Sequence, residues 1–117
     1  MSNMERRKGT TGELEVRDIF RAAGFDCDRT PNSGALRIRS DLYGNVPAHL
    51  EVKRQETARP WAWWQQATDE AQPGELPVVA FRRNRSPWLA IVDLHQLADL
   101  MAAASLATKS AGDRGDD

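Results

Sequence analysis

An acid and a base, Glu51 and Lys53, stand two positions apart in the segment HLEVKR, which begins at His49. Successive side chains of an extended chain point to opposite faces, so Leu50 and Val52 would share one face of a strand. We expect that apolar face to pack in a core. The opposite face then gathers the acid, the base and the histidine.

A second acid, Asp41, lies on the N-terminal side of this segment. A hairpin connection of about six residues would bring it beside Glu51. Magnesium is commonly bound by one or two carboxylates together with waters and substrate phosphate. A neighbouring lysine can contact developing negative charge or orient an attacking water. An acid followed by acid-x-Lys on the next strand is therefore the grouping that metal-assisted phosphodiester hydrolysis needs.

The elements that position this group follow from apolar periodicity and chain breakers, which predict the order α-β-β-β-α-β-β-α. Thr10 and Glu13 have the spacing of a capping box, and Gly24 suits the end of the first helix. Pro60 suits the first turn of a second helix, and Asp93 can cap the last. The predicted elements are helix 11–23, strands 25–30, 36–41 and 48–54 in a β-meander with a turn at 43–45, a helix from 60 to about 71, strands 77–81 and 88–92, and a helix from 94.

The chain of 117 residues suits one domain with a modest core. We expect this domain to span residues 1–108 and the small, polar residues 109–117 to form a disordered tail. Cys27 is the only cysteine, which excludes an intrachain disulfide and favours a reducing compartment. No apolar stretch approaches the roughly 20 residues of a membrane span, so we expect a cytoplasmic protein with no membrane partner.

The formal net charge of -1 gives no whole-protein attraction to nucleic acid. The charges are unevenly placed, because six basic residues oppose three acidic ones between Arg29 and Arg59. A second basic run, formed by Arg82, Arg83 and Arg85, has no acid within several positions. Local positive potential is therefore compatible with the sequence, although a solvated face explains either run as well.

A series of short motifs surrounds the acid-x-Lys group. Its members are Lys8-Gly9 and Glu13 at the head of the first helix, Gly24-Phe25, Arg29, Ser33-Gly34, Ser40-Asp41, Glu51-Val52-Lys53 and Gln66-Ala67. This ordered series, over about residues 7–92, resembles the PD-(D/E)XK nuclease superfamily, and within it the archaeal-type Holliday-junction resolvases and their phage relatives. Ser40 departs from the motif, which usually has proline at that position.

The resemblance implies an α/β fold with a restriction-endonuclease-like core, a mixed β-sheet flanked by helices. It implies a Mg²⁺ ion, for which Mn²⁺ can substitute, bound by Asp41, Glu51 and the carbonyl of Val52. Lys53 would be the catalytic lysine.

The remaining roles implied by the resemblance belong to residues outside the strand. Glu13 would reach the site from the first helix, and Gln66 would orient water or substrate, so both join the catalytic group. Lys8, Arg29 and Ser33 would contact the nucleic acid. The basic turn at 82–85, with its three arginines, would add a phosphate-contacting edge, for which a solvated loop is the alternative.

Simpler structural interpretations stay open for the site residues. Glu13 could serve only the capping box, and Asp41 could be a turn residue bonded to its own backbone. Glu51 and Lys53 could form an exposed pair that contributes under about 1 kcal/mol. His49 shares the face of Glu51 and Lys53 and could touch substrate, but a surface histidine without a role is the simpler interpretation, and we do not expect it to bind metal.

Three tryptophans crowd one turn of the second helix. Trp61 and Trp64 face the same way, and Trp63 is rotated away from both. We expect Trp64, with Ala67 and Ala71, to pack on the sheet. Trp61 or Trp63 would then stay partly exposed, for stacking on an unpaired base or for a dimer interface. We favour a homodimer, because the resolvases that the sequence resembles cut two opposed DNA strands and a symmetric dimer would place two sites suitably.

The sequence thus leads to the hypothesis of a metal-dependent DNA endonuclease that acts on branched DNA, in the host cytoplasm if it is phage-encoded. Two alternatives stay open. The domain could bind nucleic acid without cutting it, with its acids serving only the structure. It could also be an assembly subunit whose tryptophan-rich helix binds another protein.

Overall fold

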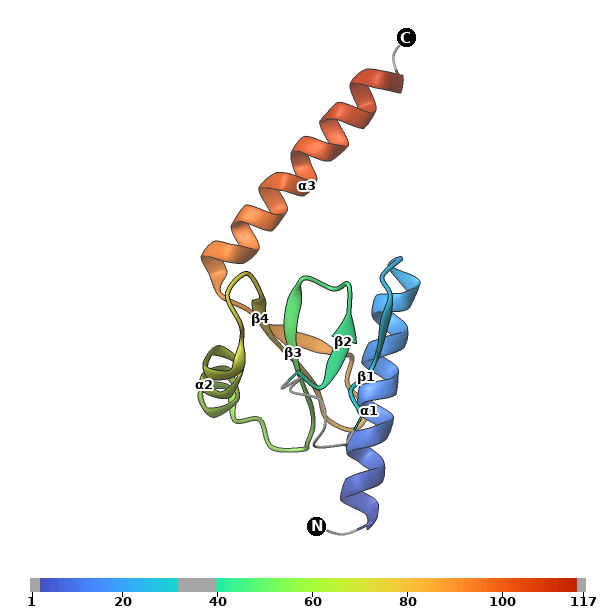
Figure 1. The fold of residues 1–117 in the computed structure, drawn as a ribbon, viewed down its shortest axis with the longest axis vertical. Helices are drawn as coiled ribbons and strands as arrows, with labels where there is room; N and C mark the ends of the chain where they lie inside the picture. The colour runs from blue at the N-terminus through green and yellow to red at the C-terminus, as the bar shows by residue number, and fades with distance from the viewer. Residues whose placement is uncertain (1–2, 32–39, 116–117) are drawn as a thin grey trace.

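The computed structural model describes residues 3–31 and 40–115, which form three helices and five strands (Figure 1). The chain order agrees with the predicted α-β-β-β-α-β-β-α series, although some boundaries differ. The elements are α1 (Asn3–Ala22), β1 (Cys27–Arg29), β2 (Leu42–Gly44), β3 (Ala48–Arg54), α2 (Pro60–Glu70), β4 (Leu76–Arg82), β5 (Leu89–Ile91) and α3 (Leu94–Gly115).

The strands β3, β4 and β5 form one sheet in that order. β3 and β4 run parallel, with Glu51 opposite Val79, and β5 is antiparallel to β4. Parallel neighbours need a crossover, which α2 provides between β3 and β4. β1 and β2 form a separate antiparallel pair. The sheet is mixed and flanked by helices, which confirms the predicted α/β class.

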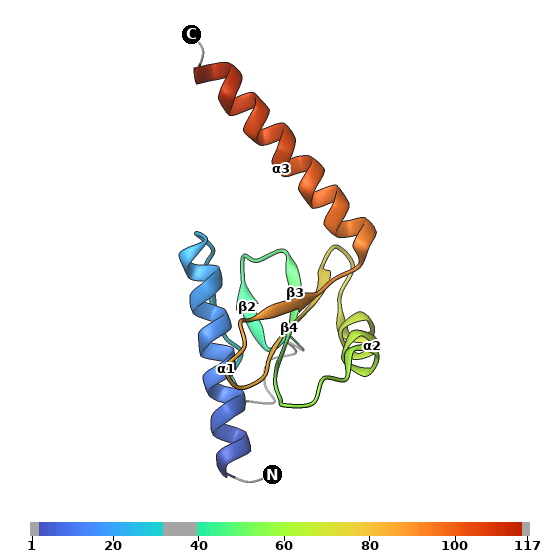
Figure 2. The same ribbon diagram turned by 180° about the vertical axis from the view of Figure 1, so that it is seen from behind.

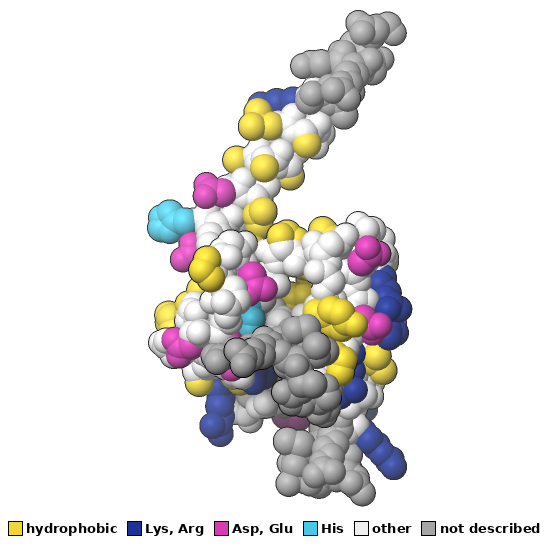
Figure 3. Space-filling view, viewed as in Figure 1, with side chains coloured by type: hydrophobic (Ala, Val, Ile, Leu, Met, Phe, Trp, Pro, Cys, Tyr) yellow, Lys and Arg dark blue, Asp and Glu magenta, His cyan; other side chains and the backbone are white. Residues whose placement is uncertain are grey.

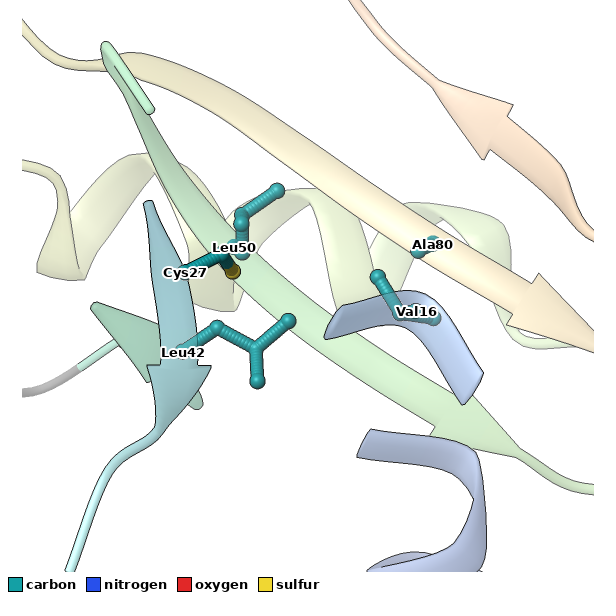
Figure 4. Close-up of a cluster of buried hydrophobic side chains, with 5 residues drawn as sticks. All are labelled: Val16, Cys27, Leu42, Leu50 and Ala80. Atoms are coloured by element: carbon teal, nitrogen blue, oxygen red, sulfur yellow. The ribbon is translucent and has the colours of Figure 1, made fainter. Parts of the chain in front are cut away.

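The first core cluster lies between α1, the β1–β2 pair and one face of the three-stranded sheet (Figure 4). Val16 of α1 packs with Leu50 of β3 and Ala80 of β4, and Cys27 and Leu42 complete the cluster. Leu50 and Leu42 are each 1% exposed. The apolar face predicted for the HLEVKR strand is therefore a core face.

The second core cluster lies between α2 and the other face of the same sheet. Trp63 and Ala67 of α2 pack on Val79 of β4, with Phe81 and Ile91 at the edge. Since side chains alternate along a strand, this is also the face that carries the acid and the lysine of β3. The helix α2 thus covers both the apolar half of this face, on β4, and its polar half, on β3.

The helix α1 begins at Asn3 instead of residue 11. The charged residues before Thr10 are good helix formers, and they extend the helix through one glycine. Thr10 and Glu13 therefore lie inside the helix, and the predicted capping box is wrong. Gly12 has a packing role, because a Cβ at this position would lie 3.3 Å from the Trp88 ring.

The segment Leu42–Gly44 is a strand, where the sequence predicted a turn at 43–45. Gly44 pairs with Cys27, at a φ of 145°. A Cβ on Gly44 would lie 2.0 Å from the carbonyl oxygen of Asp26, so the pairing requires glycine. The predicted strand at 36–41 lies outside the described residues, apart from residues 40 and 41.

The buried tryptophan of α2 is Trp63, which is 5% exposed and whose ring lies 5.7 Å from that of Phe81. Trp64 is half-buried beside it, and Trp61 is 84% exposed. Trp63 and Ala67, four positions apart, share one face of the helix. The prediction that Trp64 leads the packed stripe was wrong by one residue, whereas the exposure of Trp61 is confirmed.

The helix α3 extends to Gly115 and projects away from the sheet (Figure 1, Figure 2). The alanine-rich residues 102–107 favour a helix, and the described helix continues into the segment from Lys109, for which the sequence predicted a disordered tail. Large apolar side chains are exposed along it (Figure 3): Leu94, Leu97, Leu100, Met101 and Leu106. Within residues 3–31 and 40–115, no helix is long and apolar enough to cross a membrane.

Candidate active site

Asp41 is fixed against the outer edge of β3 by two hydrogen bonds. Its N–H donates to the carbonyl oxygen of Leu50 at 2.8 Å. The N–H of Val52 donates to Asp41 Oδ2 at 2.7 Å. The structure thus brings Asp41 to the strand that carries Glu51, as the length of the connection predicted.

Ser40 contributes a side-chain clamp where the related motif has proline. Its hydroxyl accepts from the N–H of Leu50 at 2.8 Å and donates to the Leu50 carbonyl at 3.2 Å. The Ser40 carbonyl accepts from the hydroxyl of Thr30 at 2.7 Å. Ser40 is 7% exposed, so these bonds are made away from water. They tie the chain just before Asp41 to β3.

Glu51 lies on the α2 face of β3 and is 2% exposed. Its Oε1 is 2.7 Å from Nε2 of His49, which is 1% exposed. The alternative of an exposed Glu51–Lys53 pair is therefore wrong, and so is the interpretation of His49 as a surface residue. Both interpretations failed because α2 covers this face of β3, and the sequence pattern alone does not show that a helix packs there.

Lys53 and Gln66 meet across the β3–α2 interface. The Lys53 Nζ donates to Gln66 Oε1 at 2.9 Å. A neutral amide holds the ammonium group in place without cancelling its charge. The glutamine that the sequence singled out on the second helix therefore lies beside the lysine of the strand.

Glu13 approaches from α1, where its carboxylate forms an ion pair with Arg29. Its negative charge contributes to the raised pKa of Asp41. Acids from α1 and from the edge of β3 are therefore electrostatically linked.

The arrangement so far places acids from three parts of the chain, a lysine and a glutamine around one strand of a mixed sheet. Over residues 4–112 the sequence matches the family described as "Phage putative PDDEXK endonuclease". The chain belongs to this family. Protein D14 of Escherichia phage T5 is a relative, 29% identical over an alignment that covers 75% of this chain and 70% of Protein D14. The resemblance to PD-(D/E)XK nucleases is confirmed.

The carboxyl groups of Asp41, beside β3, and of Glu51, within it, both have raised pKa values. Burial raises the pKa of Asp41 to about 6, and the negative charges of Glu13 and Glu70 add to the shift. Burial also raises the pKa of Glu51, and hydrogen bonding to Glu70 and the charge of Asp41 act in the same direction. The charged forms of both acids are therefore disfavoured in this poorly hydrated region when no cation is present.

This donor set fits a divalent cation. The carboxylate oxygens of Asp41 and Glu51 are hard ligands of the kind that Mg²⁺ prefers. A nearby cation also offsets the repulsion between the acids and the cost of burying their negative charge, which together raise both pKa values. The N–H of Val52 is bonded to Asp41, and the role of its carbonyl as a third ligand stays a prediction from the resemblance. PDDEXK nucleases in general use divalent metals, which agrees with this chemistry.

The arginines expected to contact DNA have unequal surroundings. Arg82 donates to Glu15 at 2.7 Å, and its guanidinium lies 5.9 Å from the centroid of the Trp88 ring. Arg83 and Arg85 are exposed in the turn after β4. Within this turn, free positive charge therefore rests on the last two arginines.

The other residues expected to contact DNA lie near the N-terminal elements. Lys8 is half-buried on α1, and Arg29, with 32% of its side chain exposed, is engaged by Glu13. Ser33 lies outside the described residues.

Two residues at the site escaped the sequence interpretation as functional candidates, His49 and Glu70. Glu70 ends α2, and its Oε2 lies 3.5 Å from His49 Nε2. It is four positions after Gln66, so the two share a helix face, and this spacing could have identified it. The burial of His49 depends on where α2 lies, which no local pattern contains.

Proposed function

We propose that this PDDEXK endonuclease hydrolyses DNA phosphodiester bonds with Mg²⁺ as its cofactor, for which Mn²⁺ can substitute. The observation that carries the proposal is the meeting of Asp41 and Glu51 at one strand, followed at once by Lys53. Gln66 holds the lysine in place from α2. These groups supply metal ligands and a positive charge within one buried region.

Asp41, Glu51 and the carbonyl of Val52 would hold the cation, which supplies an activated water and offsets charge on the phosphate when bound. Lys53 would contact the phosphate as negative charge develops on it. Gln66 would keep the ammonium group aimed at the substrate.

Glu13 and the basic residues would act around this centre. Glu13, held by Arg29, would position a water or the substrate from α1. The residues proposed to contact DNA are Lys8, Arg29, Ser33, Arg82, Arg83 and Arg85.

Branched DNA is the proposed substrate, with the similarity to archaeal-type resolvases as its support. Such a substrate is cut on two opposed strands, which favours a homodimer with two symmetric sites. Trp61, the exposed tryptophan of α2, is available for that interface or for stacking on an unpaired base. The relation to phage proteins supports action in the cytoplasm of a host cell.

The proposal is tested by incubating the purified protein with a labelled four-way junction and with a matched linear duplex, in Mg²⁺ and in EDTA. We expect paired symmetric nicks in the junction alone, absent in EDTA and in Glu51→Gln. Asp99→Asn, an exposed acid on α3, serves as the matched control and should cut like the parent. Equal cutting of both substrates would refute the branched-DNA preference, and cutting that survives EDTA would refute metal dependence.

A further inference from the structure

Three potential metal ligands converge at the end of the active-site strand that lies away from Lys53. They are Nε2 of His49, a carboxylate oxygen of Glu51 and a carboxylate oxygen of Glu70, and all lie within 4.8 Å of one another. Two come from β3 and one from the last turn of α2. None of the roles proposed above uses His49 or Glu70.

The distances suit a cation between these atoms. His49 Nε2 lies 2.7 Å from Glu51 Oε1 and 3.5 Å from Glu70 Oε2. A metal with bonds of about 2.1 Å places adjacent ligand atoms about 3.0 Å apart in octahedral and about 3.4 Å apart in tetrahedral coordination. The observed values bracket these spacings, so small side-chain shifts would be enough for a cation to lie between the three ligand atoms.

The burial of the cluster is graded in a way that suits metal entry. His49 and Glu51 have side chains that are 1% and 2% exposed, whereas 29% of the Glu70 side chain is exposed. The inner ligands are held rigidly by the strand and the helix above it. Glu70 leaves a route from solvent.

Charge also favours a cation over a purely structural hydrogen bond. Glu51 is hydrogen-bonded to Glu70 and also feels the charge of Asp41, so a cation between His49, Glu51 and Glu70 would offset the repulsion among these acids. The ammonium group of Lys53 acts on Glu51 only through its charge, because its hydrogen bond is to Gln66.

The donor types distinguish this cluster from the Mg²⁺ site. One imidazole nitrogen with two carboxylates suits Mn²⁺, Co²⁺ or Zn²⁺, whereas Mg²⁺ favours oxygen ligands. We propose that His49, Glu51 and Glu70 form a second cation site, selective for first-row transition metals. Because Glu51 would serve both sites, this inference extends the proposed function and rests on it for the role of the first cation.

The test uses Mn²⁺ alone as the probe. Metal-free protein is titrated with Mn²⁺, and the bound ion is examined by pulsed electron paramagnetic resonance for coupling to an imidazole ¹⁴N nucleus. The chain has two histidines, His49 and His95, and His95 is 99% exposed on α3. His95→Gln is therefore a matched control for His49→Gln.

We expect imidazole coupling in the parent and in His95→Gln, and its loss in His49→Gln. Glu70→Gln should weaken Mn²⁺ binding at the nitrogen-coupled site at least tenfold, while Mg²⁺ binding changes less than twofold. Glu70 is partly exposed, so this variant should fold even if His49→Gln does not, and circular dichroism checks both. Bound Mn²⁺ without nitrogen coupling in the parent, or coupling that survives in His49→Gln, would overturn the inference.

A cleavage assay with Mg²⁺ separates the two proposals. Cleavage by a parent protein that gives no nitrogen coupling would refute the second site and leave the proposed function intact. Nitrogen coupling in a protein that cuts no DNA in either metal would refute the nuclease proposal and leave the cation site established.

Discussion

In the metal-free protein, ionisation of Asp41 lowers the free energy of unfolding. The pKa of this carboxyl rises from an ordinary 3.8 to about 6, chiefly because the group is buried. Between these pH values the folded protein keeps a proton that the unfolded chain has released. The free energy of unfolding therefore falls as the pH rises from about 4 to about 6. The cost amounts to at most about 3 kcal/mol.

Asp41→Asn should consequently stabilise the protein in EDTA. We expect a gain of up to about 3 kcal/mol at pH 8, shrinking toward zero near pH 4, because only the ionised carboxyl is penalised. Urea unfolding at the two pH values measures it. Mg²⁺ should raise the stability of the parent above that of the variant, because the cation needs the carboxylate. An Asp41→Asn variant less stable than the parent at pH 8 without metal would contradict this account, and Asp99→Asn provides the control.

Ser40→Ala tests the clamp that replaces the usual proline. The change leaves the buried N–H of Leu50 without its partner, which costs about 1–3 kcal/mol. Since the clamp precedes Asp41, Mg²⁺ affinity should also fall. Urea unfolding measures the stability, and calorimetric titration measures the Mg²⁺ affinity. Ser105→Ala, at an exposed position of α3, is the matched control. If Ser40→Ala kept full stability and full Mg²⁺ affinity, the clamp would have no positioning role.

At the scale of residues, the sequence predicted those contacts that depend on short spacing. The alternation in HLEVKR placed Leu50 in the core and Glu51 on the opposite face, and a short connection brought Asp41 to the same strand. The cluster formed by His49, Glu51 and Glu70 could not be predicted in this way. Its members meet only because a helix lies over the strand, and that contact is tertiary.

At the scale of elements, α2 both completes the core and covers the site. Trp63→Ala should lower the free energy of unfolding by about 3–5 kcal/mol, since it empties a well-packed position between α2 and β4. Trp61→Ala should change it by about 0.5 kcal/mol or less, because Trp61 is largely exposed. Urea denaturation distinguishes the two. Similar losses in both variants would mean that the packing of α2 differs from that described.

The elements were predicted best where periodicity and chain breakers agree. β3 has the predicted bounds of 48–54, and α2 begins at the predicted Pro60. The start of α1 was missed because the spacing of Thr10 and Glu13 suggested a helix cap, whereas the helix propensity of the preceding residues extends the helix back to Asn3. β2 was missed because Gly44 suggested a turn, although the glycine permits a close approach between strands.

At the scale of the whole molecule, the net charge of -1 limits general attraction to DNA, so local arginines must contribute most of it. We expect Arg83→Ala combined with Arg85→Ala to reduce the slope of log affinity against log salt by about 1 to 2, one phosphate contact for each arginine. Fluorescence anisotropy with a labelled junction in EDTA, at several salt concentrations, measures this slope. An unchanged slope would exclude the turn after β4 from the DNA interface, and Asp99→Asn should leave the slope unaltered.

The most direct test of the active site is the single-turnover cleavage rate in Mg²⁺, compared between the parent and Lys53→Met. Methionine keeps much of the length of the side chain and removes its charge, so DNA binding and folding should persist. We predict a rate loss on the order of 10² or more, because Lys53 would contact charge that develops in the transition state. Cleavage at the parental rate by folded Lys53→Met would contradict the assignment of catalysis to this strand.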